Sequence, residues 1–340
     1  MRKTLFSILT LLLVLSCKEK TKKASQIVES KTESIELRKN LDTISLLFID
    51  STMVRKHLYT IASDEMQGRK AGTPGIEKAA QYIENEYKRM GLSTFDTLAS
   101  YRQTFTFNPR GSKESITSSN IIGVLEGQSK KNEFVIISAH YDHVGINQRE
   151  GVLDSIYNGA NDDASGVTGV LALAEHFKKV GNERTLVFVA FTAEEMGIIG
   201  SKYFGKTIDA SKFVAGLNLE MIGKTPSFGP NTAWLTGFDR SNLGKIIQKN
   251  LKGTGYQLYP DPYKKFNLFY RSDNASLARL GVPSHTFSTT AIDTDQDYHQ
   301  PSDEASTLDI KVITQTIQAI AVGAKTIISG EDTPTRIALE

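Results

Sequence analysis

Strand-like and helix-like segments alternate along most of this 340-residue chain, and this alternation restricts the fold more than any other feature. Residues 184–191, RTLVFVAF, form a nearly continuous apolar run, as expected for a strand that is covered on both faces. The apolar positions of residues 74–90 recur at helical spacing, after a Thr-Pro pair that favours a helix start and before Gly91, which favours its end. Strands that alternate with helices predict an α/β three-layer sandwich with a mostly parallel central sheet. The other predicted strands are residues 120–125, 134–139, 214–219 and 282–287, and the other predicted helices are residues 165–177, 241–251 and 273–280. Residues 304–328 are predicted to contain a long C-terminal helix.

The first 17 residues, MRKTLFSILTLLLVLSC, combine a basic start, an apolar stretch too short to cross a bilayer comfortably and a cysteine. The stretch predicts a signal peptide, and its end resembles the lipobox of bacterial lipoproteins, in which the cysteine is lipidated. The residues that follow are rich in Lys, Glu, Ser and Thr, which favours a flexible tether. The predicted order is a signal peptide over 1–16, a tether over 17–40 that starts at lipidated Cys17, a single domain over 41–330 and a frayed tail over 331–340.

Composition excludes several classes of protein. The 40 Lys and Arg residues nearly balance the 38 Asp and Glu residues, giving a formal charge of +2, so we expect no nucleic-acid partner. The single cysteine excludes an internal disulfide and a thiolate metal cluster. The sequence does not indicate an oligomeric state.

Polar side chains follow several of the predicted strands where each strand ends. His140 and Asp142 lie in SAHYDHVG, two adjacent glutamates follow the strand at 184–191, and Glu220 follows the next strand. The motif NDDASG opens a helix, and DYHQP lies late in the chain. Because ligand sites in such sheets form beyond the carboxyl ends of the strands, we expect these side chains to meet. Two imidazoles with several carboxylates and no thiolate suit zinc or a similar divalent ion. The number of carboxylates exceeds what one tetrahedral ion needs, which suggests two ions sharing one bridging carboxylate.

The order of these motifs closely resembles the co-catalytic di-zinc aminopeptidases, a family that includes secreted bacterial leucyl aminopeptidases and, among its relatives, glutamate carboxypeptidases and glutaminyl cyclases. The matching motifs are SAHYDHVG, GANDDASG, FTAEEMGIIGS, LNLEMIG, SDNASLARLGVP and DYHQPSD. The resemblance extends from about Leu58 to Ile328. It implies a zinc-exopeptidase-like fold for the domain at 41–330 and two zinc ions per chain.

The resemblance also assigns roles to individual residues. It implies five zinc ligands, namely His140, Asp162, Glu195, Glu220 and His299. Asp162 would bridge the two ions, and Glu194 would act as general base. Asp142 would orient His140 through the second ring nitrogen. Tyr298 occupies a position from which some members stabilise the oxyanion.

Further expectations concern residues near these motifs. His143 is not a ligand in the family, and the family's cis peptide is expected at Asp142-His143. Glu220 stands where many relatives have Asp, and its longer side chain bears on the position and affinity of the second metal ion. Three further histidines, His57, His176 and His285, are expected to be structural or exposed.

The resemblance implies an aminopeptidase that hydrolyses the N-terminal peptide bond of peptides with a metal-activated water. The lipid anchor predicts a location outside the cytoplasm, on the bilayer at the periplasmic face or the cell surface. A dipeptidase or carboxypeptidase of the same fold would need a basic pocket, for which Arg271, Lys264 and Lys265 are candidates. The same fold could also belong to a glutaminyl cyclase-like transferase with one zinc or to a non-enzymatic binding lipoprotein. Pocket residues are expected in segments 228–238, 256–269 and 287–297.

Overall fold

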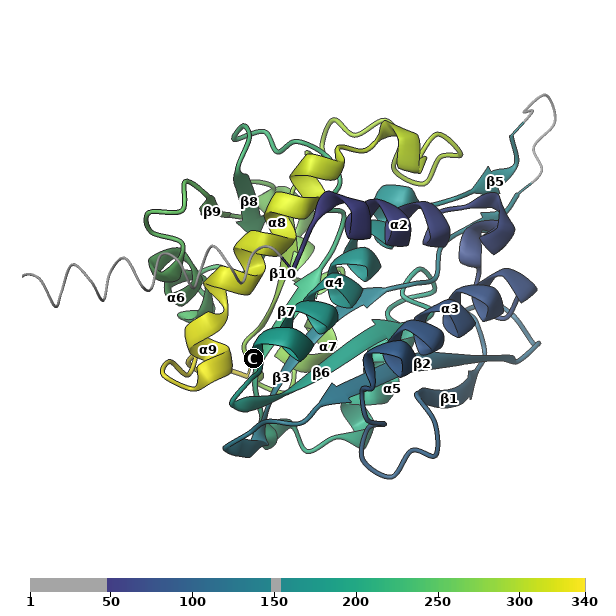
Figure 1. The fold of residues 1–340 in the computed structure, drawn as a ribbon. Coiled ribbons are helices and arrows are strands. Elements are labelled where there is room, and N and C mark those ends of the chain that lie inside the picture. The colour runs from purple at the N-terminus through teal and green to yellow at the C-terminus, as the bar shows by residue number, and fades with distance from the viewer. Residues whose placement is uncertain (1–47, 148–153, 340) are drawn as a thin grey trace, which may run out of the picture. The chain divides into compact units, whose positions relative to one another are not determined.

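The computed structural model describes residues 48–147 and 154–339. The predicted signal peptide, Cys17 and the tether lie outside these residues. The described chain forms an eight-stranded sheet in the order β1-β2-β6-β3-β7-β10-β8-β9, whose central strands β6, β3, β7 and β10 run parallel (Figure 1). The strands are β1 (Arg102–Phe107), β2 (Ile116–Leu125), β3 (Lys130–His140), β6 (Arg184–Phe191), β7 (Phe213–Leu219), β8 (Thr232–Leu235), β9 (Gln257–Pro260) and β10 (Ser284–Ser288), with a separate hairpin of β4 (Gly145–Ile146) and β5 (Ile156–Tyr157).

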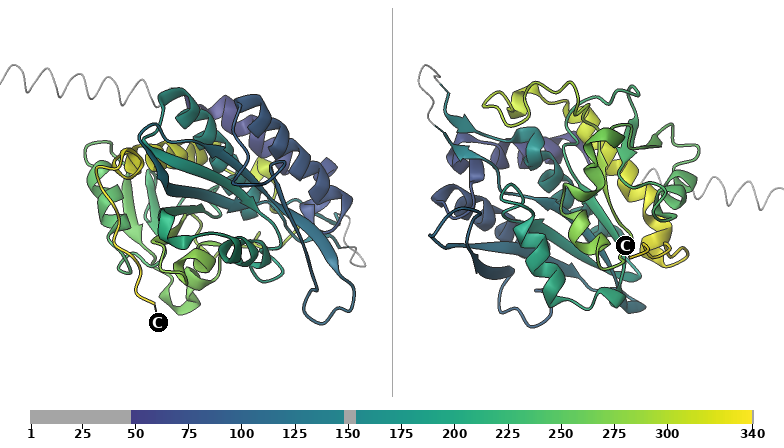
Figure 2. Two further views of the ribbon diagram at one scale, coloured as in Figure 1. Left: turned by 90° about the horizontal axis from the view of Figure 1, so that it is seen from below. Right: turned by 180° about the vertical axis from the view of Figure 1, so that it is seen from behind.

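Helices cover both faces of the sheet and complete three layers. Helices α2, α3, α4 and α8 lie on one face, whereas α5 and α7 lie on the other, as the view from behind in Figure 2 shows. The helices are α2 (Ser51–Ile61), α3 (Pro74–Met90), α4 (Ser165–Val180), α5 (Ile199–Thr207), α6 (Leu243–Asn250), α7 (Asn274–Ala278), α8 (Ile310–Gly323) and α9 (Lys325–Ser329). This architecture confirms the predicted α/β three-layer sandwich.

Burial explains why the central segments form these elements. Every residue of β6 is buried, because the strand lies inside the sheet with helices on both sides. Helix α4 is buried almost all round, since it packs between the sheet and the outer helices. Its Gly169 permits this close approach: a Cβ there would lie 2.3 Å from the side chain of Leu219 on β7. The helix is therefore fixed against the end of β7, where Glu220 follows.

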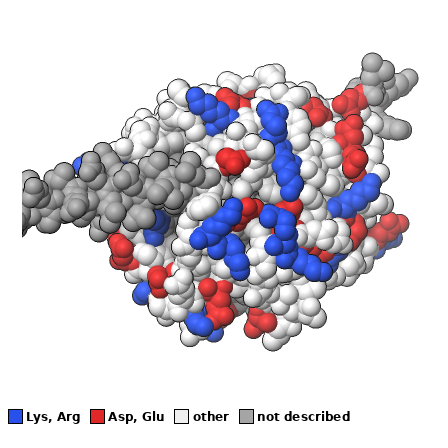
Figure 3. All heavy atoms as spheres, in the orientation of Figure 1, with Lys and Arg blue, Asp and Glu red and all other residues white. Residues whose placement is uncertain are grey.

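Charges of both signs mix on the surface. Figure 3 shows Lys and Arg side chains interspersed with Asp and Glu on the face that carries α2, α3 and α8. Many of them pair, as Arg102 does with Glu77 and Glu84, each at 2.7 Å. Among the residues the structure describes, no helix is long and apolar enough to cross a membrane.

Residues near the C-terminus pack against the domain, whereas the sequence predicted a frayed tail. The guanidinium of Arg184, in β6, donates to the carbonyl oxygen of Asp332 at 2.8 Å and to the hydroxyl of Thr333 at 2.5 Å. The side chain of Ile337 is buried, and its N–H donates to the carbonyl of Gly281 at 3.1 Å. Asp332, Thr333 and Ile337 are thus held against the domain, and the first two supply hydrogen-bond acceptors to the buried guanidinium of Arg184.

The long C-terminal helix that residues 304–328 are predicted to contain is α8. It begins at Ile310, where the side chain of Asp309 accepts the N–H groups of Lys311 and Val312, and it breaks at Ala324. Helices α2 and α5 and the short strands of the hairpin and the sheet edges, β1, β4, β5, β8 and β9, were not predicted.

Two buried histidines should make folding sensitive to acid. The ring of His285 donates from Nδ1 to the carbonyl of Thr236 at 2.8 Å, and its Nε2 accepts from the hydroxyl of Ser241 at 2.7 Å, so the neutral ring is satisfied. Burial lowers the pKa of both His57 and His285 from 6.5 to about 4. Between these pH values the unfolded chain binds protons that the folded chain does not, so the free energy of unfolding should fall as pH drops from about 6.5 to 4. The loss is at most about 3 kcal/mol per histidine.

Denaturant unfolding of the metal-free protein at several pH values measures this effect. The variant His285→Gln should show a shallower loss of stability between pH 6.5 and 4 than the wild type, since metal ligands contribute equally to both. If the free energy of unfolding falls equally with pH in both proteins, groups other than His285 cause the acid sensitivity.

Candidate metal centre

The candidate ligands converge at one edge of the sheet, as their positions after the strands predicted. His140 is the last residue of β3, Glu195 lies in the turn after β6, and Glu220 directly follows β7. Asp162 lies in the helical turn Ala160–Ala164 that leads into α4, and His299 lies in the loop between β10 and α8. Each side chain therefore reaches the site from a different connection.

Asp162 lies at the centre of these side chains and offers one oxygen to each of two groups. Nε2 of His140 lies 3.1 Å from Asp162 Oδ1 and 3.3 Å from Glu220 Oε1. Nε2 of His299 lies 3.2 Å from Asp162 Oδ2 and 3.0 Å from Glu195 Oε2. The structure thus brings all five predicted ligands together and divides them into two sets that share one carboxylate.

The orientation of His140 suits a metal ligand. Its Nδ1 lies 3.0 Å from the main-chain carbonyl of Asp142, and because a carbonyl only accepts, Nδ1 must carry the proton. Nε2, which faces Asp162 and Glu220, is then free to bind a cation. The donor set of imidazole nitrogens and carboxylate oxygens, gathered at one place, fits zinc or a similar divalent ion.

Asp142 contacts the second ring nitrogen of His140 with its main-chain carbonyl, and its carboxylate has another role. The carboxylate lies 3.8 Å from Nδ1, beyond hydrogen-bond distance, and accepts the backbone N–H groups of Glu194 at 3.0 Å and Glu195 at 3.3 Å. The main chain of Asp142 holds the histidine, whereas the carboxylate fixes the turn that carries both glutamates. Burial raises the pKa of Asp142 to about 6.

The cis peptide lies at Asp162-Asp163 and not at Asp142-His143, so the expected position is wrong. The backbone after Asp142 continues in hydrogen-bonded form, since the N–H of His143 donates to the carbonyl of Arg69 at 3.2 Å. Asp163 in turn anchors the loop: one oxygen accepts the N–H groups of Gly166 at 3.0 Å and Met221 at 3.1 Å.

His143, which is not a ligand in the family, lies directly beside the site. Its Nδ1 is 2.9 Å from Glu195 Oε1, and it groups with Asp162, Glu195 and His299 within metal-binding distance. Its Nε2 is buried, without a hydrogen-bond partner in the described part of the chain. The ring fits there because Gly159, at a positive φ of 51°, has no Cβ; one would lie 2.4 Å from the imidazole.

Arg69 holds the backbone around this loop, and the sequence did not predict a role for it. It is fully buried, and its guanidinium donates to four backbone carbonyls at 2.6–2.9 Å. The acceptors are Ile61, Tyr141, Asn158 and Gly159. No local pattern predicts such a residue, since its partners come from three separate segments.

Glu194 differs from the other acids of the site. Its carboxylate accepts no hydrogen bond from any residue that the structure describes, although the carboxylates around it are all engaged. Burial raises the pKa of Glu194 well above its ordinary value. Glu220, by contrast, is held by the hydroxyl of Ser272, which donates to Oε2 at 2.7 Å. The longer arm of this glutamate is therefore fixed and not mobile.

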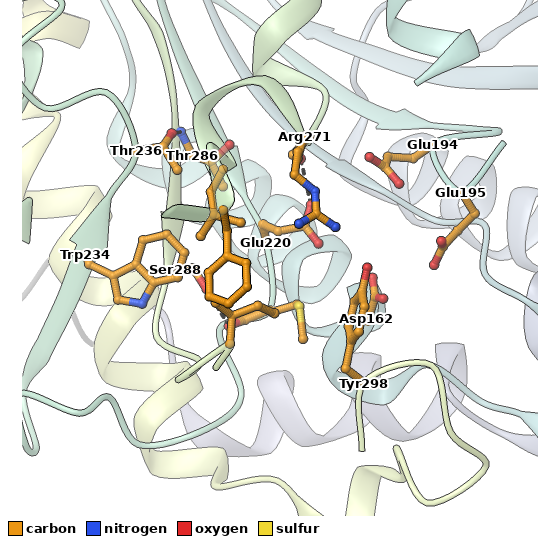
Figure 4. A pocket seen from close by; sticks show the side chains of 15 residues that line it. Asp162, Glu194, Glu195, Glu220, Trp234, Thr236, Arg271, Thr286, Ser288 and Tyr298 are labelled. Atoms are coloured by element: carbon orange, nitrogen blue, oxygen red, sulfur yellow. Dashed lines mark hydrogen bonds between the residues drawn. The ribbon is translucent and has the colours of Figure 1, made fainter. Parts of the chain in front are cut away.

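A cavity of about 310 Å³ opens onto these acids (Figure 4). Its charged wall comprises Asp162, Glu194, Glu195 and Glu220. Its apolar wall comprises Met221, Trp234, Phe266, Leu268 and Ile292, which come in part from the three segments predicted to form the pocket. Tyr298 also lines the cavity and stacks on His299, with ring centroids 4.0 Å apart. Arg271 lines the cavity as well, with Thr236, Ser272, Thr286 and Ser288.

Lys224 ties together two of the loops that form the site. Its ammonium group pairs with Asp295 and, at 2.7 Å, with Asp297, so the segment after Glu220 holds the loop that carries Tyr298 and His299. His299 has a positive φ of 54°, which non-glycine residues rarely adopt and which needs such support.

Lys224→Met should therefore weaken metal binding about tenfold, because His299 loses its fixed position. A competition titration with a chelator measures the dissociation constant. Lys249→Met is the matched control, since Lys249 pairs with Asp332 on the surface at 3.5 Å. Equal affinities of wild type and Lys224→Met would show that the tie does not position the ligand.

Together the sheet and the imidazole-carboxylate cluster at its edge define a zinc-exopeptidase-like α/β domain. Residues 120–323 match the model described as Peptidase family M28, and the chain belongs to this family. This membership confirms the resemblance to the co-catalytic zinc aminopeptidases.

Individual relatives agree with this membership. Aminopeptidase YwaD of Bacillus subtilis (strain 168) is 32% identical over 111 residues, which cover 32% of this chain and 22% of that protein. These curated relatives are much longer than the matching region: the match covers 22% of YwaD and 16% of a second relative. Two solved structures share the fold. An aminopeptidase from Aneurinibacillus sp. strain AM-1 has a TM-score of 0.65 at 17% identity, covering 88% of this chain and 98% of that one. Porphyromonas gingivalis glutaminyl cyclase has a TM-score of 0.67 at 15% identity, covering 83% and 99%.

Proposed function

We propose that this protein is a zinc-dependent aminopeptidase that hydrolyses the N-terminal peptide bond of peptides and holds two zinc ions per chain. The observation that carries the proposal is the central position of Asp162, whose two oxygens face separate ligand sets. His140 and Glu220 would hold one ion, Glu195 and His299 the other, with Asp162 shared between them. Bound zinc supplies a water of lowered pKa and polarises a carbonyl oxygen.

The chain's own residues supply the proton transfers and the positioning. Glu194 lines the cavity with a free carboxylate, so it accepts the proton of the attacking water and returns it to the leaving amine. Asp142 keeps Glu194 in place through the backbone N–H. The hydroxyl of Tyr298 donates a hydrogen bond to the developing oxyanion. The apolar wall, with Trp234 and Phe266, receives the side chain of the N-terminal residue.

The charge of the cavity supports an aminopeptidase within the family. Its acidic wall favours a positively charged substrate group, as the α-amine of an unblocked peptide is. The anchor that the first 17 residues predict would hold the enzyme at the bilayer through lipidated Cys17, outside the cytoplasm, where it would act on peptides.

Zinc content and the effect of a blocked N-terminus test the proposal. Elemental analysis of the purified protein should give two zinc ions per chain. Leucine aminomethylcoumarin should be hydrolysed, and its N-acetylated form should not, because the blocked amine carries no charge. Equal hydrolysis of both compounds would contradict an aminopeptidase.

N-terminal glutamine cyclisation is the second candidate, because the fold is shared with a glutaminyl cyclase at a TM-score of 0.67. One zinc per chain together with ammonia release from Gln-peptides would favour it. The complete second ligand set of His140 and Glu220 supports hydrolysis instead.

A further inference from the structure

Arg271 is the one basic side chain among the described residues that line the cavity, and it has no partner there. Its guanidinium is directed into the cavity (Figure 4). Its backbone N–H donates to Leu268, but its side chain makes no hydrogen bond, ion pair or ring contact with any described residue. Two other arginines, Arg240 and Arg279, are engaged, since both lie over the ring of Tyr270.

The charge of the cavity leaves this cation available. None of the four carboxylates of the lining pairs with Arg271, and three of them, Asp162, Glu195 and Glu220, would hold the two divalent ions of the proposed function. Arg271 then remains an unpaired cation in the lining of the cavity. A guanidinium in such a place binds carboxylates well, because its planar N–H donors match the two oxygens.

Its place relative to the other groups also fits a substrate anion. Figure 4 shows Arg271 apart from Trp234, across the cavity, with Glu220 between them. The apolar wall would receive one side chain of the substrate, while Arg271 lies on the side of Glu194 and Glu220. Neither Lys264 nor Lys265, the other two cations considered for a basic pocket, lines the cavity.

We propose that Arg271 determines specificity by binding a carboxylate of the substrate. This inference rests on the proposed peptidase function and adds a preferred substrate class, acidic peptides. The carboxylate is either the C-terminal group of a dipeptide or the side chain of an acidic residue. Both present the same oxygens to the guanidinium, so the two sources are separated by experiment.

Paired substrates that differ by one carboxylate test the proposal in the zinc-loaded enzyme. Leu-Gly is compared with Leu-Gly-amide, and glutamyl with glutaminyl aminomethylcoumarin. The wild type should prefer the charged member of one pair by about tenfold to one-hundredfold in kcat/KM, mainly through KM. Arg271→Met should remove this preference, while Arg271→Lys should retain part of it. Lys265→Met, which changes an exposed cation in the same loop, should leave it unchanged.

The pair that responds identifies the source of the carboxylate. Loss of preference in the Leu-Gly pair assigns the C-terminal group, and loss in the glutamyl pair assigns the side chain. If Arg271→Met slows all four substrates by the same factor, or none, the proposal is overturned.

A binding measurement separates this proposal from the proposed function. Calorimetry of Leu-Gly and Leu-Gly-amide, and of Glu-amide and Gln-amide, with zinc-loaded Glu194→Gln should show the same preference without turnover. If the wild type hydrolyses none of the substrates but Arg271 still discriminates in binding, only the proposed function fails. Equal binding of both members of each pair overturns the role of Arg271.

Discussion

Glu194→Gln should lower kcat by about 10²- to 10⁴-fold and leave the zinc content unchanged. The glutamine keeps the size of the side chain but cannot accept the proton of the attacking water. Glu194 belongs to neither of the two groups of side chains that lie within metal-binding distance of one another, so removing its charge should not release metal. Steady-state kinetics with leucine aminomethylcoumarin and elemental analysis of the same preparation measure the two effects.

Glu65→Gln is the matched control, because Glu65 is an exposed glutamate outside the ligand cluster. It should behave as wild type. Turnover near the wild-type rate in Glu194→Gln would reject Glu194 as the base, and a parallel loss of zinc would make it a ligand instead.

Asp162→Asn should have an equally large effect, but through the metal. Both oxygens of Asp162 face imidazoles of separate ligand sets, so an amide, which is neutral and offers one oxygen, cannot serve both. We expect fewer than two zinc ions per chain and turnover reduced at least as far as in Glu194→Gln. The melting temperature should also rise less on addition of zinc, since ligand binding stabilises the folded state.

Elemental analysis and thermal unfolding with and without zinc provide these measurements. Asp154→Asn, a change at an exposed aspartate, serves as control. Two zinc ions in Asp162→Asn would show that another carboxylate bridges the sets, and Asp163, which groups with His140 and Glu220, would be the first candidate.

The strand pattern of the sequence predicts where two of the ligands lie, and the resemblance to the family implies the full set. His140 and Glu220 end or follow buried parallel strands, and the geometry of a parallel sheet then brings them to one edge. The strands β8 and β9 escape prediction because each has only four residues and pairs near one edge of the sheet. Short segments carry little periodic signal.

The supporting contacts could not be predicted for a different reason. Whether the carboxylate or the carbonyl of Asp142 contacts His140 depends on a side-chain rotamer, which residue type does not specify. The tie from Lys224 to Asp295 joins residues far apart in the chain, and nothing local marks either partner. The ring of His143 enters the site only because Gly159 leaves room for it.

The segment 331–339 bears on how the protein is made. Arg184 lies in a fully buried strand of the sheet, yet its partners Asp332 and Thr333 are translated almost 150 residues later. While the ribosome still holds these residues, the guanidinium lacks two of its acceptors and the strand cannot settle in its final environment. Arg184 can therefore acquire its full set of acceptors only after Asp332 and Thr333 have left the exit tunnel.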